Sequence, residues 1–151
     1  MKKLIALVAA VAMLAAFSAC GAEALDKNKL TLSEYNDQVM NEQVRLFVKQ
    51  KTVTAGTEQV TMVLENLTEL DYTYDAVQRL EVKLDGDWYV MEDQQAGVIL
   101  SIDTLPAETT EEYTFYFEGH YGKLPRGSYR IVKLLVDSDG GLALACAEFD
   151  I

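Results

Sequence analysis

The residues with the clearest catalytic potential are one histidine and a large set of acids. His120 is the only histidine in the chain. A hydrolase of the Ser-His-Asp type would depend on it, yet no strained nucleophile turn precedes it, and its setting in Gly119–Gly122 is typical of a tight corner. The 24 acidic residues include many carboxylate pairs. Glycoside hydrolases use such pairs, but at this abundance they carry no information. We predict no catalytic residue.

Metal ligands are also sparse. One histidine and one cysteine free for coordination argue against a zinc site. The segment Asp137–Gly141, Asp-Ser-Asp-Gly-Gly, has the composition of a calcium loop. In the EF-hand register, however, the first ligand position falls on Leu135 and the twelfth on Cys146, so the ligand set fails. We interpret this segment as a hairpin turn and predict no metal and no cofactor.

Covalent chemistry is indicated at the N-terminus. Two lysines precede an unbroken apolar run from Leu4 to Phe17, which is typical of a secretory signal peptide. The run is too short to span a bilayer comfortably, since a spanning helix needs roughly 20 residues. The segment Phe17–Gly21, Phe-Ser-Ala-Cys-Gly, resembles a bacterial lipobox, with Phe17 in place of the expected leucine.

A lipobox cysteine receives a diacylglyceryl group and becomes the new N-terminus. We therefore predict a signal peptide over residues 1–19 and a lipid-anchored Cys20. The attachment would be stable, because two or more acyl chains on one residue hold a protein on the membrane. Simple secretion with cleavage near Ala19 is the alternative. In the leading interpretation, the protein lies at the extracytoplasmic face of a cell membrane.

Composition excludes one large class of functions. Residues 20–151 carry 11 basic and 24 acidic side chains, a formal charge of −13. Such a surface repels nucleic acid and anionic lipid headgroups, because phosphate contacts need clustered Lys and Arg. We predict no nucleic-acid partner. Cys146 has no disulfide partner once Cys20 is acylated, and its apolar surroundings predict a buried, unreactive thiol.

The elements that position these residues are strands. Residues 20–43 are mostly polar without sustained periodicity, and we interpret them as a tether with a short helix starting near Ser33. From residue 44 the pattern alternates with period two, which predicts a β-sandwich domain over 44–151. The strands are expected at Val44–Val48, Val60–Glu65, Leu70–Leu84, Asp87–Met91, Val98–Ile102, Thr110–Glu118, Tyr129–Val136 and Leu142–Asp150. Asp85-Gly86 is a strong hairpin signal.

The glycine-punctuated stretch from Gly119 to Val136 joins a corner to an apolar strand. Leu124 and the proline after it preset a turn, Gly127 supplies a conformation costly for other residues, and Tyr129 opens the strand. This order predicts a tyrosine corner, in which the hydroxyl of Tyr129 bonds back to the preceding backbone and pins the crossover between two sheets. An ordinary turn is the alternative.

Aromatic residues are the best candidates for a contact surface. Trp88, Tyr89 and Tyr116 are residue types enriched in binding hot spots. Tyr116 alternates with Phe115 and Phe117 and so faces the other side of its strand. For Trp88, packing in the core or half-core is the favoured interpretation, and a place in a contact surface is the alternative.

The order and spacing of the turns and strands resemble a known family, the bacterial Ig-like domain found in lipoproteins of Firmicutes. The resemblance covers residues 44–151 and is carried by Glu65-Asn66, Asp71–Tyr74, Leu80-Glu81, Asp85–Tyr89, Tyr121–Lys133 and Ala147–Phe149. It implies an all-β, immunoglobulin-like antiparallel sandwich of about seven or eight strands, preceded by the signal peptide and tether. It implies no catalytic residues.

We therefore expect a non-enzymatic, lipid-anchored module that acts through contacts with an unidentified protein or envelope component. A small envelope hydrolase, or an inhibitor of an envelope enzyme, is the competing hypothesis. It requires a cleft with convergent carboxylates or His120 in a perturbed setting.

Overall fold

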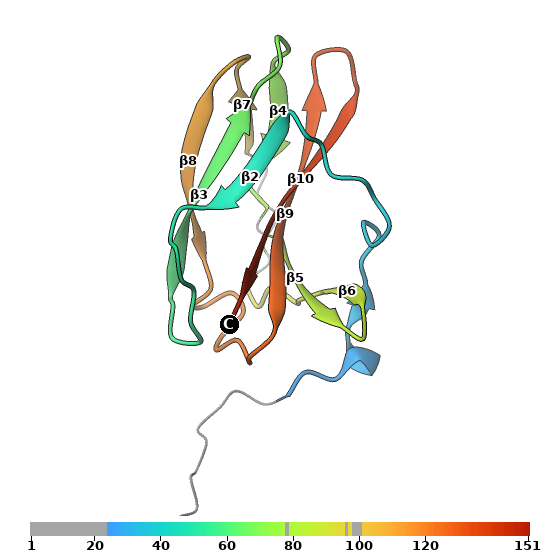
Figure 1. The fold of residues 1–151 in the computed structure, drawn as a ribbon, viewed down its shortest axis with the longest axis vertical. Helices are drawn as coiled ribbons and strands as arrows, with labels where there is room; N and C mark the ends of the chain where they lie inside the picture. The colour runs from blue at the N-terminus through green and yellow to red at the C-terminus, as the bar shows by residue number, and fades with distance from the viewer. Residues whose placement is uncertain (1–23, 78, 96, 98–100) are drawn as a thin grey trace, which may run out of the picture.

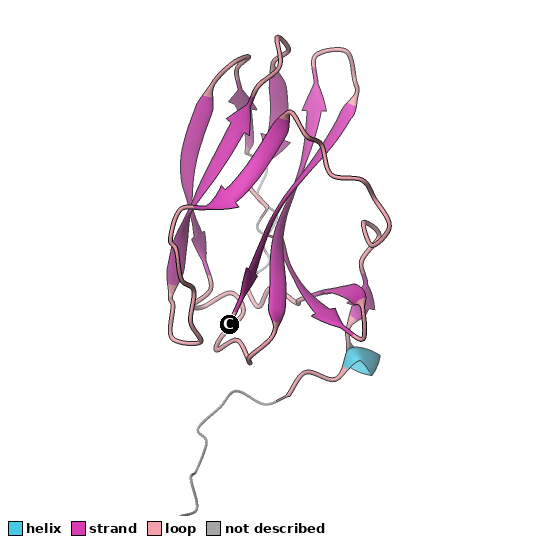
Figure 2. Cartoon of the chain, in the orientation of Figure 1, coloured by secondary structure: helices cyan, strands magenta, loops and turns pink. Residues whose placement is uncertain are grey.

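A computed structural model of the protein describes residues 24–77, 79–95, 97 and 101–151, and it shows two antiparallel sheets packed face to face (Figures 1 and 2). The elements are η1 (Lys27–Lys29), β1 (Thr31–Leu32), β2 (Val44–Val48), β3 (Gln59–Asn66), β4 (Tyr72–Asp75), β5 (Arg79–Leu84), β6 (Asp87–Val90), β7 (Ile102–Leu105), β8 (Thr110–Tyr116), β9 (Ser128–Asp137) and β10 (Leu142–Asp150). η1 is a 3₁₀ turn, and the described residues contain no α-helix. The predicted all-β sandwich is confirmed.

One sheet has seven strands and the other three. The larger sheet runs in the order β1-β6-β5-β9-β4-β7, with β10 on β9, and the smaller runs β2-β3-β8. β9 is long enough to pair with β5 through Tyr129–Val132 and with β4 through Leu135–Asp137. The extended segment predicted from Leu70 to Leu84 is therefore two strands. The predicted strand at Val98–Ile102 lies partly outside the described residues, and β7 begins at Ile102.

The core lies between the inner faces of the two sheets. Alternation along each strand sends one set of side chains inward, and the largest fully buried ones are Tyr129, Phe115 and Phe117. Phe115 stacks on Tyr121 with ring centroids 6.0 Å apart. The predicted Asp85-Gly86 hairpin joins β5 to β6, and both residues have positive φ, +54° and +101°. Such a turn matches the twist of the strands that it connects.

Part of the segment predicted as a tether belongs to the folded unit. β1 pairs with β6, and the Ser33 amide extends the pairing by donating to the Trp88 carbonyl at 2.8 Å. In place of the helix expected near Ser33, the chain makes a turn, with the Asn36 amide donating to the Ser33 carbonyl. None of the described helices is long and apolar enough to cross a membrane.

The corner before β9 is held by Tyr129. Its side chain is fully buried, and its hydroxyl donates a hydrogen bond to the carbonyl oxygen of Pro125 at 2.7 Å. Leu124 is also buried in the core. The expectation for Gly127 is wrong: the positive φ angles in this stretch belong to Gly119 and Gly122, while the Gly127 backbone pairs with Ile151. The left-handed bends therefore precede the Leu-Pro turn.

We predict that Tyr129→Phe keeps the fold and lowers the free energy of unfolding by about 1 kcal/mol or somewhat more, because the Pro125 carbonyl loses its buried donor. Urea denaturation of both proteins measures the difference. An unchanged denaturation midpoint would count against a stabilising corner.

Tyr113 is the matched control. Within the described part of the chain, its hydroxyl is buried without a hydrogen-bond partner. Removing a buried hydroxyl that bonds nothing leaves no acceptor or donor unsatisfied. Tyr113→Phe is therefore expected to leave stability unchanged or to raise it, opposite in sign to Tyr129→Phe.

Candidate interaction surface

The three aromatic residues considered as candidates for a contact surface do not lie together on one surface. Trp88 is only 5% exposed, so it is not available for binding in this conformation. Tyr89 faces the core and is half-buried, whereas Tyr116 is 45% exposed on β8 in the other sheet and stacks on His120. Because Trp88 and Tyr89 lie on β6, the fold separates them from Tyr116. Only Tyr116 remains a surface candidate.

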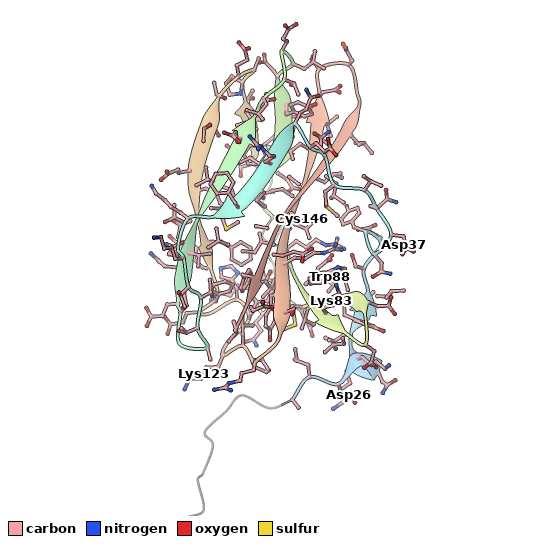
Figure 3. The ribbon with its side chains drawn as sticks, viewed as in Figure 1. Asp26, Asp37, Lys83, Trp88, Lys123 and Cys146 are labelled. Atoms are coloured by element: carbon pink, nitrogen blue, oxygen red, sulfur yellow. The ribbon has the colours of Figure 1, made fainter. Side chains whose placement is uncertain are left out.

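Trp88 is buried on the outer face of the larger sheet, beneath the N-terminal segment. The Arg130 guanidinium lies 4.5 Å from its ring centroid and the Lys83 ammonium 5.2 Å away, and Figure 3 shows Trp88 and Lys83 side by side. The Trp88 amide donates to the Asn36 side chain at 2.8 Å. Trp88 is therefore packed against cations, which are attracted to its electron-rich ring. In antibody domains the corresponding tryptophan packs against a disulfide instead.

A buried polar cluster lies next to Trp88, and its centre is Glu81, which is 0% exposed. One carboxylate oxygen accepts from the Ser33 hydroxyl at 2.6 Å and from Arg79 Nε at 2.8 Å. The other accepts from Arg130 Nε at 2.6 Å. The Arg130 Nη2 group also donates to the Tyr35 carbonyl at 3.2 Å. This cluster fastens the segment around Ser33 to strands β5 and β9.

Sequence patterns give no signal for this cluster. Arg79 and Glu81 alternate with apolar residues as they would on a solvated sheet face, and Ser33 is 48 residues from Glu81 in the chain. Docking of the N-terminal segment brings the Ser33 hydroxyl against Glu81 and Arg79 and covers this part of the sheet. Both carboxylate oxygens of Glu81 already accept hydrogen bonds from donors of the protein. The cluster therefore neutralises charge and holds the N-terminal segment in place.

His120 has a structural setting. Its Nδ1 atom lies 2.9 Å from an Asp93 carboxylate oxygen, and its ring stacks on Tyr116 and is tilted against Tyr121. Among the described residues no serine or cysteine side chain is hydrogen-bonded to it. The same part of the chain holds no group of three or more His, Cys, Asp or Glu side chains arranged to bind a metal. Burial raises the pKa of Cys146 to about 12, which keeps its thiol protonated at neutral pH.

The strongest candidate for an interaction surface is the open seam between β2 and β10. β10 pairs with β9 only, and β2 with β3 only, among the described strands. Gly127 and Ile151 exchange both backbone hydrogen bonds, which marks them as a hydrogen-bonded pair. Because such pairs alternate along an antiparallel ladder, the N–H and C=O groups of Cys146, Glu148 and Asp150 point away from β9.

The edge of β2 faces this row. Lys49 donates to the Thr61 carbonyl and Leu67 to the Gln43 carbonyl, so the alternation turns the backbone groups of Leu46 and Val48 away from β3. No ladder joins β2 to β10 in the described structure, although their Cα atoms approach within 8 Å. Two rows of backbone donors and acceptors therefore lie on the two sides of one seam.

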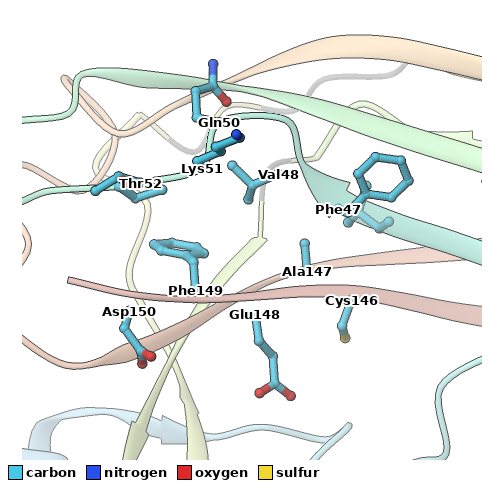
Figure 4. A pocket seen from close by; sticks show the side chains of 12 residues that line it. Phe47, Val48, Gln50, Lys51, Thr52, Cys146, Ala147, Glu148, Phe149 and Asp150 are labelled. Carbon is cyan, nitrogen blue, oxygen red and sulfur yellow. The ribbon is translucent and has the colours of Figure 1, made fainter.

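Asn41 closes one end of the seam. Its amide donates to the Leu144 carbonyl at 2.8 Å, and its side-chain oxygen accepts from the Val44 amide at 2.8 Å, so one residue bridges β10 and β2. Beyond this bridge the seam widens into a hollow of about 470 Å³ (Figure 4). It is lined by Leu46–Val48 and Gln50–Val53 on one side and by Cys146–Asp150 on the other.

The two faces of β10 differ along the hollow. Ala147 and Phe149 point toward the core between the sheets, while Cys146, Glu148 and Asp150 point the other way (Figure 4). Glu148 and Asp150 are exposed, and the Asp150 carboxylate accepts from the Ser128 hydroxyl at 2.7 Å. The β10 side of the hollow is thus acidic outside and apolar inside. Lys51, on the opposite wall, is the one cation among the described residues that line the hollow.

A comparison with protein families agrees with this architecture. A family model described as bacterial Ig-like domain matches residues 40–149. No curated protein matches the chain. A solved X-ray structure, Northeast Structural Genomics Consortium target SoR45, is 18% identical, with 74% of this chain and 88% of that chain covered and a TM-score of 0.44. The family match spans most of the chain, and the protein belongs to the bacterial Ig-like domain family.

Proposed function

We propose that this protein is a non-enzymatic, lipid-anchored Ig-like module at the extracytoplasmic face of a cell membrane, where it binds a protein or an envelope component. The observation that carries the proposal is the family assignment of the domain together with the lipobox-like Cys20 that precedes it. Residues 1–23, which include Cys20, lie outside the described residues.

The docked N-terminal segment supports this proposal. Leu25 and Leu30 pack against the core of the domain, and Asp26 is six positions after Cys20 in the chain. An extended chain spans at most about 3.6 Å per residue, so a lipid on Cys20 would hold the η1 end of the domain within about 20 Å of the membrane surface. η1 lies at the same end as the C-terminus (Figure 1). The module would therefore be presented in a restricted orientation.

Metabolic labelling with an alkyne fatty acid tests the anchor. We expect the full chain to be labelled and to fractionate with membranes, and Cys20→Ser to lose both properties. Cys146→Ser is the matched control, because it removes the only other cysteine, and it should be labelled like the wild type. An unlabelled wild type, or equal labelling of Cys20→Ser, would contradict the anchor. Crosslinking of the anchored protein in native membranes, followed by pull-down, would then identify the partner.

A further inference from the structure

We infer that the free edge of β10, from Cys146 to Asp150, is a binding site for an extended protein segment in which basic and apolar residues alternate. This inference deepens the proposed function, because it names the class of partner. It rests on the proposed function in one respect, which is that the module is a binding protein. The first support is the unpaired backbone of β10 described above. A strand laid against this edge would bond the N–H and C=O groups of Cys146, Glu148 and Asp150.

The hollow beside the edge gives room for such a strand. β2 approaches β10 near the Asn41 bridge, but the chain at Gln50–Val53 forms the far wall of a space of about 470 Å³ beside Cys146–Asp150. Neighbouring strands lie about 4.8 Å apart in a sheet. The site therefore begins on the C-terminal side of the Asn41 bridge and runs along β10 toward Asp150. In this part only side chains and the end of β2 face the edge (Figure 4).

Side-chain preferences follow from the register. A residue directly opposite Glu148 or Asp150 places its side chain on the same outer face as these two carboxylates, where Lys or Arg is favourable and Asp or Glu is not. A residue opposite Ala147 or Phe149 points to the inner side, against apolar groups. The partner segment should thus alternate basic and apolar residues.

Overall charge selects this partner over a second copy of the chain. Residues 20–151 carry a formal charge of −13, so pairing of two β10 edges would bring Glu148 and Asp150 of each copy together. Like charges opposite one another in a sheet are destabilising, whereas a basic strand is attracted by the field of the whole protein.

The test measures binding of synthetic eight-residue peptides to the full chain purified in mild detergent. One probe alternates Lys and Val, and the control alternates Glu and Val. A third probe is the Lys-Val peptide with alternate amides N-methylated on the bonding edge. We expect saturable binding of the first peptide, seen as fluorescence anisotropy, and at least tenfold weaker binding of the other two. Hydrogen exchange should show new protection at the amides of Cys146 and Glu148.

Variants of the edge complete the test. Glu148→Pro removes an N–H that points away from β9, so the β9–β10 ladder stays intact while peptide binding should be lost. Glu148→Lys should weaken binding of the Lys-Val peptide at least fivefold. Asp139→Lys, the same charge change on the β9–β10 turn, should weaken it less than twofold. If Glu148→Pro fails to fold, Glu148→Lys and the exchange data decide.

Three results of the peptide experiments would overturn the inference. They are no saturable binding of the Lys-Val peptide, equal binding of the Lys-Val and N-methylated peptides, and protection confined to another surface. Protection of Cys146 and Glu148 in a dimer without peptide would also overturn it, in favour of a second copy. None of these results depends on fatty-acid labelling, so the site and the anchor can fail separately.

Discussion

Replacing Glu81 with alanine is expected to lower the free energy of unfolding by about 3–5 kcal/mol, because it removes one partner of a buried ion pair. The carboxylate is fully buried and accepts bonds from Arg79, Arg130 and Ser33. Its removal leaves the Arg130 guanidinium, which is 2% exposed, without its main counter-charge. Such a loss is a large fraction of the roughly 5–15 kcal/mol that stabilises a typical domain.

Glu34→Ala is the control for Glu81→Ala. Glu34 also bonds Arg79, at 2.8 Å, but its side chain is 67% exposed, so its loss should cost less than about 1 kcal/mol. Urea denaturation measures both variants. Limited proteolysis near Ser33 should show that Glu81→Ala also loosens the N-terminal segment. A Glu81→Ala protein within 1 kcal/mol of the wild type by this measurement would contradict a stabilising role for the cluster.

A double variant separates packing from charge. Glu81→Met with Arg130→Met replaces the buried ion pair with apolar side chains of similar length, and it should recover most of the stability lost in Glu81→Ala, because neither charge is then left buried alone. If the double variant is as unstable as Glu81→Ala, the geometry of the salt bridge itself, including the bond from Arg130 to the Tyr35 carbonyl, stabilises the docked segment.

Local signals in the sequence predicted most of the sandwich. Val44–Val48 and Leu142–Asp150 are strands with the bounds that their alternation indicates, and Asp85-Gly86 forms the expected hairpin turn. These features depend on side-chain periodicity and on the tolerance of a few residue types for positive φ, both of which are properties of short segments. The same reasoning wrongly assigned a positive φ angle to Gly127. Where several glycines lie in one turn region, the sequence alone does not show which of them has positive φ.

The candidate surface depends on contacts between distant segments. Trp88 is buried because residues near Ser33 and Asn36 cover it, and nothing in the Asp87–Val90 pattern indicates this cover. The seam depends on how β2 meets β10 and on the Asn41 bridge between them. Sequence alternation assigns a side chain to a face of its strand. It does not show whether another segment covers that face, or whether an edge has a partner strand.

Raising the pH from about 10 to about 12 is expected to destabilise the protein strongly. Burial raises the pKa of Tyr129 to about 12, and it also raises the pKa of Tyr74, Tyr113 and Tyr121 above the ordinary value of 10.0. In this window the unfolded chain releases the phenolic protons before the folded chain does. The stability that these groups contribute is therefore complete below pH 10 and is lost as the pH rises toward about 12.

The size of the alkaline effect follows from the number of groups. Each pKa unit corresponds to about 1.4 kcal/mol, and after a discount for solvent screening the tyrosines together should remove roughly 3–6 kcal/mol. Cys146, whose burial raises its pKa from 9.0 to about 12, acts in the same direction. Lys133 acts in the opposite direction, because burial lowers its pKa and the folded state releases that proton first. One lysine does not offset four tyrosines and a thiol.

Urea midpoints and tyrosinate absorbance, both followed as the pH is raised from about 9 to 12, measure this loss. We expect the absorbance change and the loss of the far-ultraviolet circular dichroism to coincide, since the buried hydroxyls ionise when the sandwich opens. Tyr113→Phe removes one raised pKa and should shift the alkaline transition to higher pH. Tyrosines that ionise fully near pH 10 in a still-folded protein would contradict the prediction. That result would mean that water reaches these hydroxyls through the sandwich, as it would if the seam between β2 and β10 opened into the core.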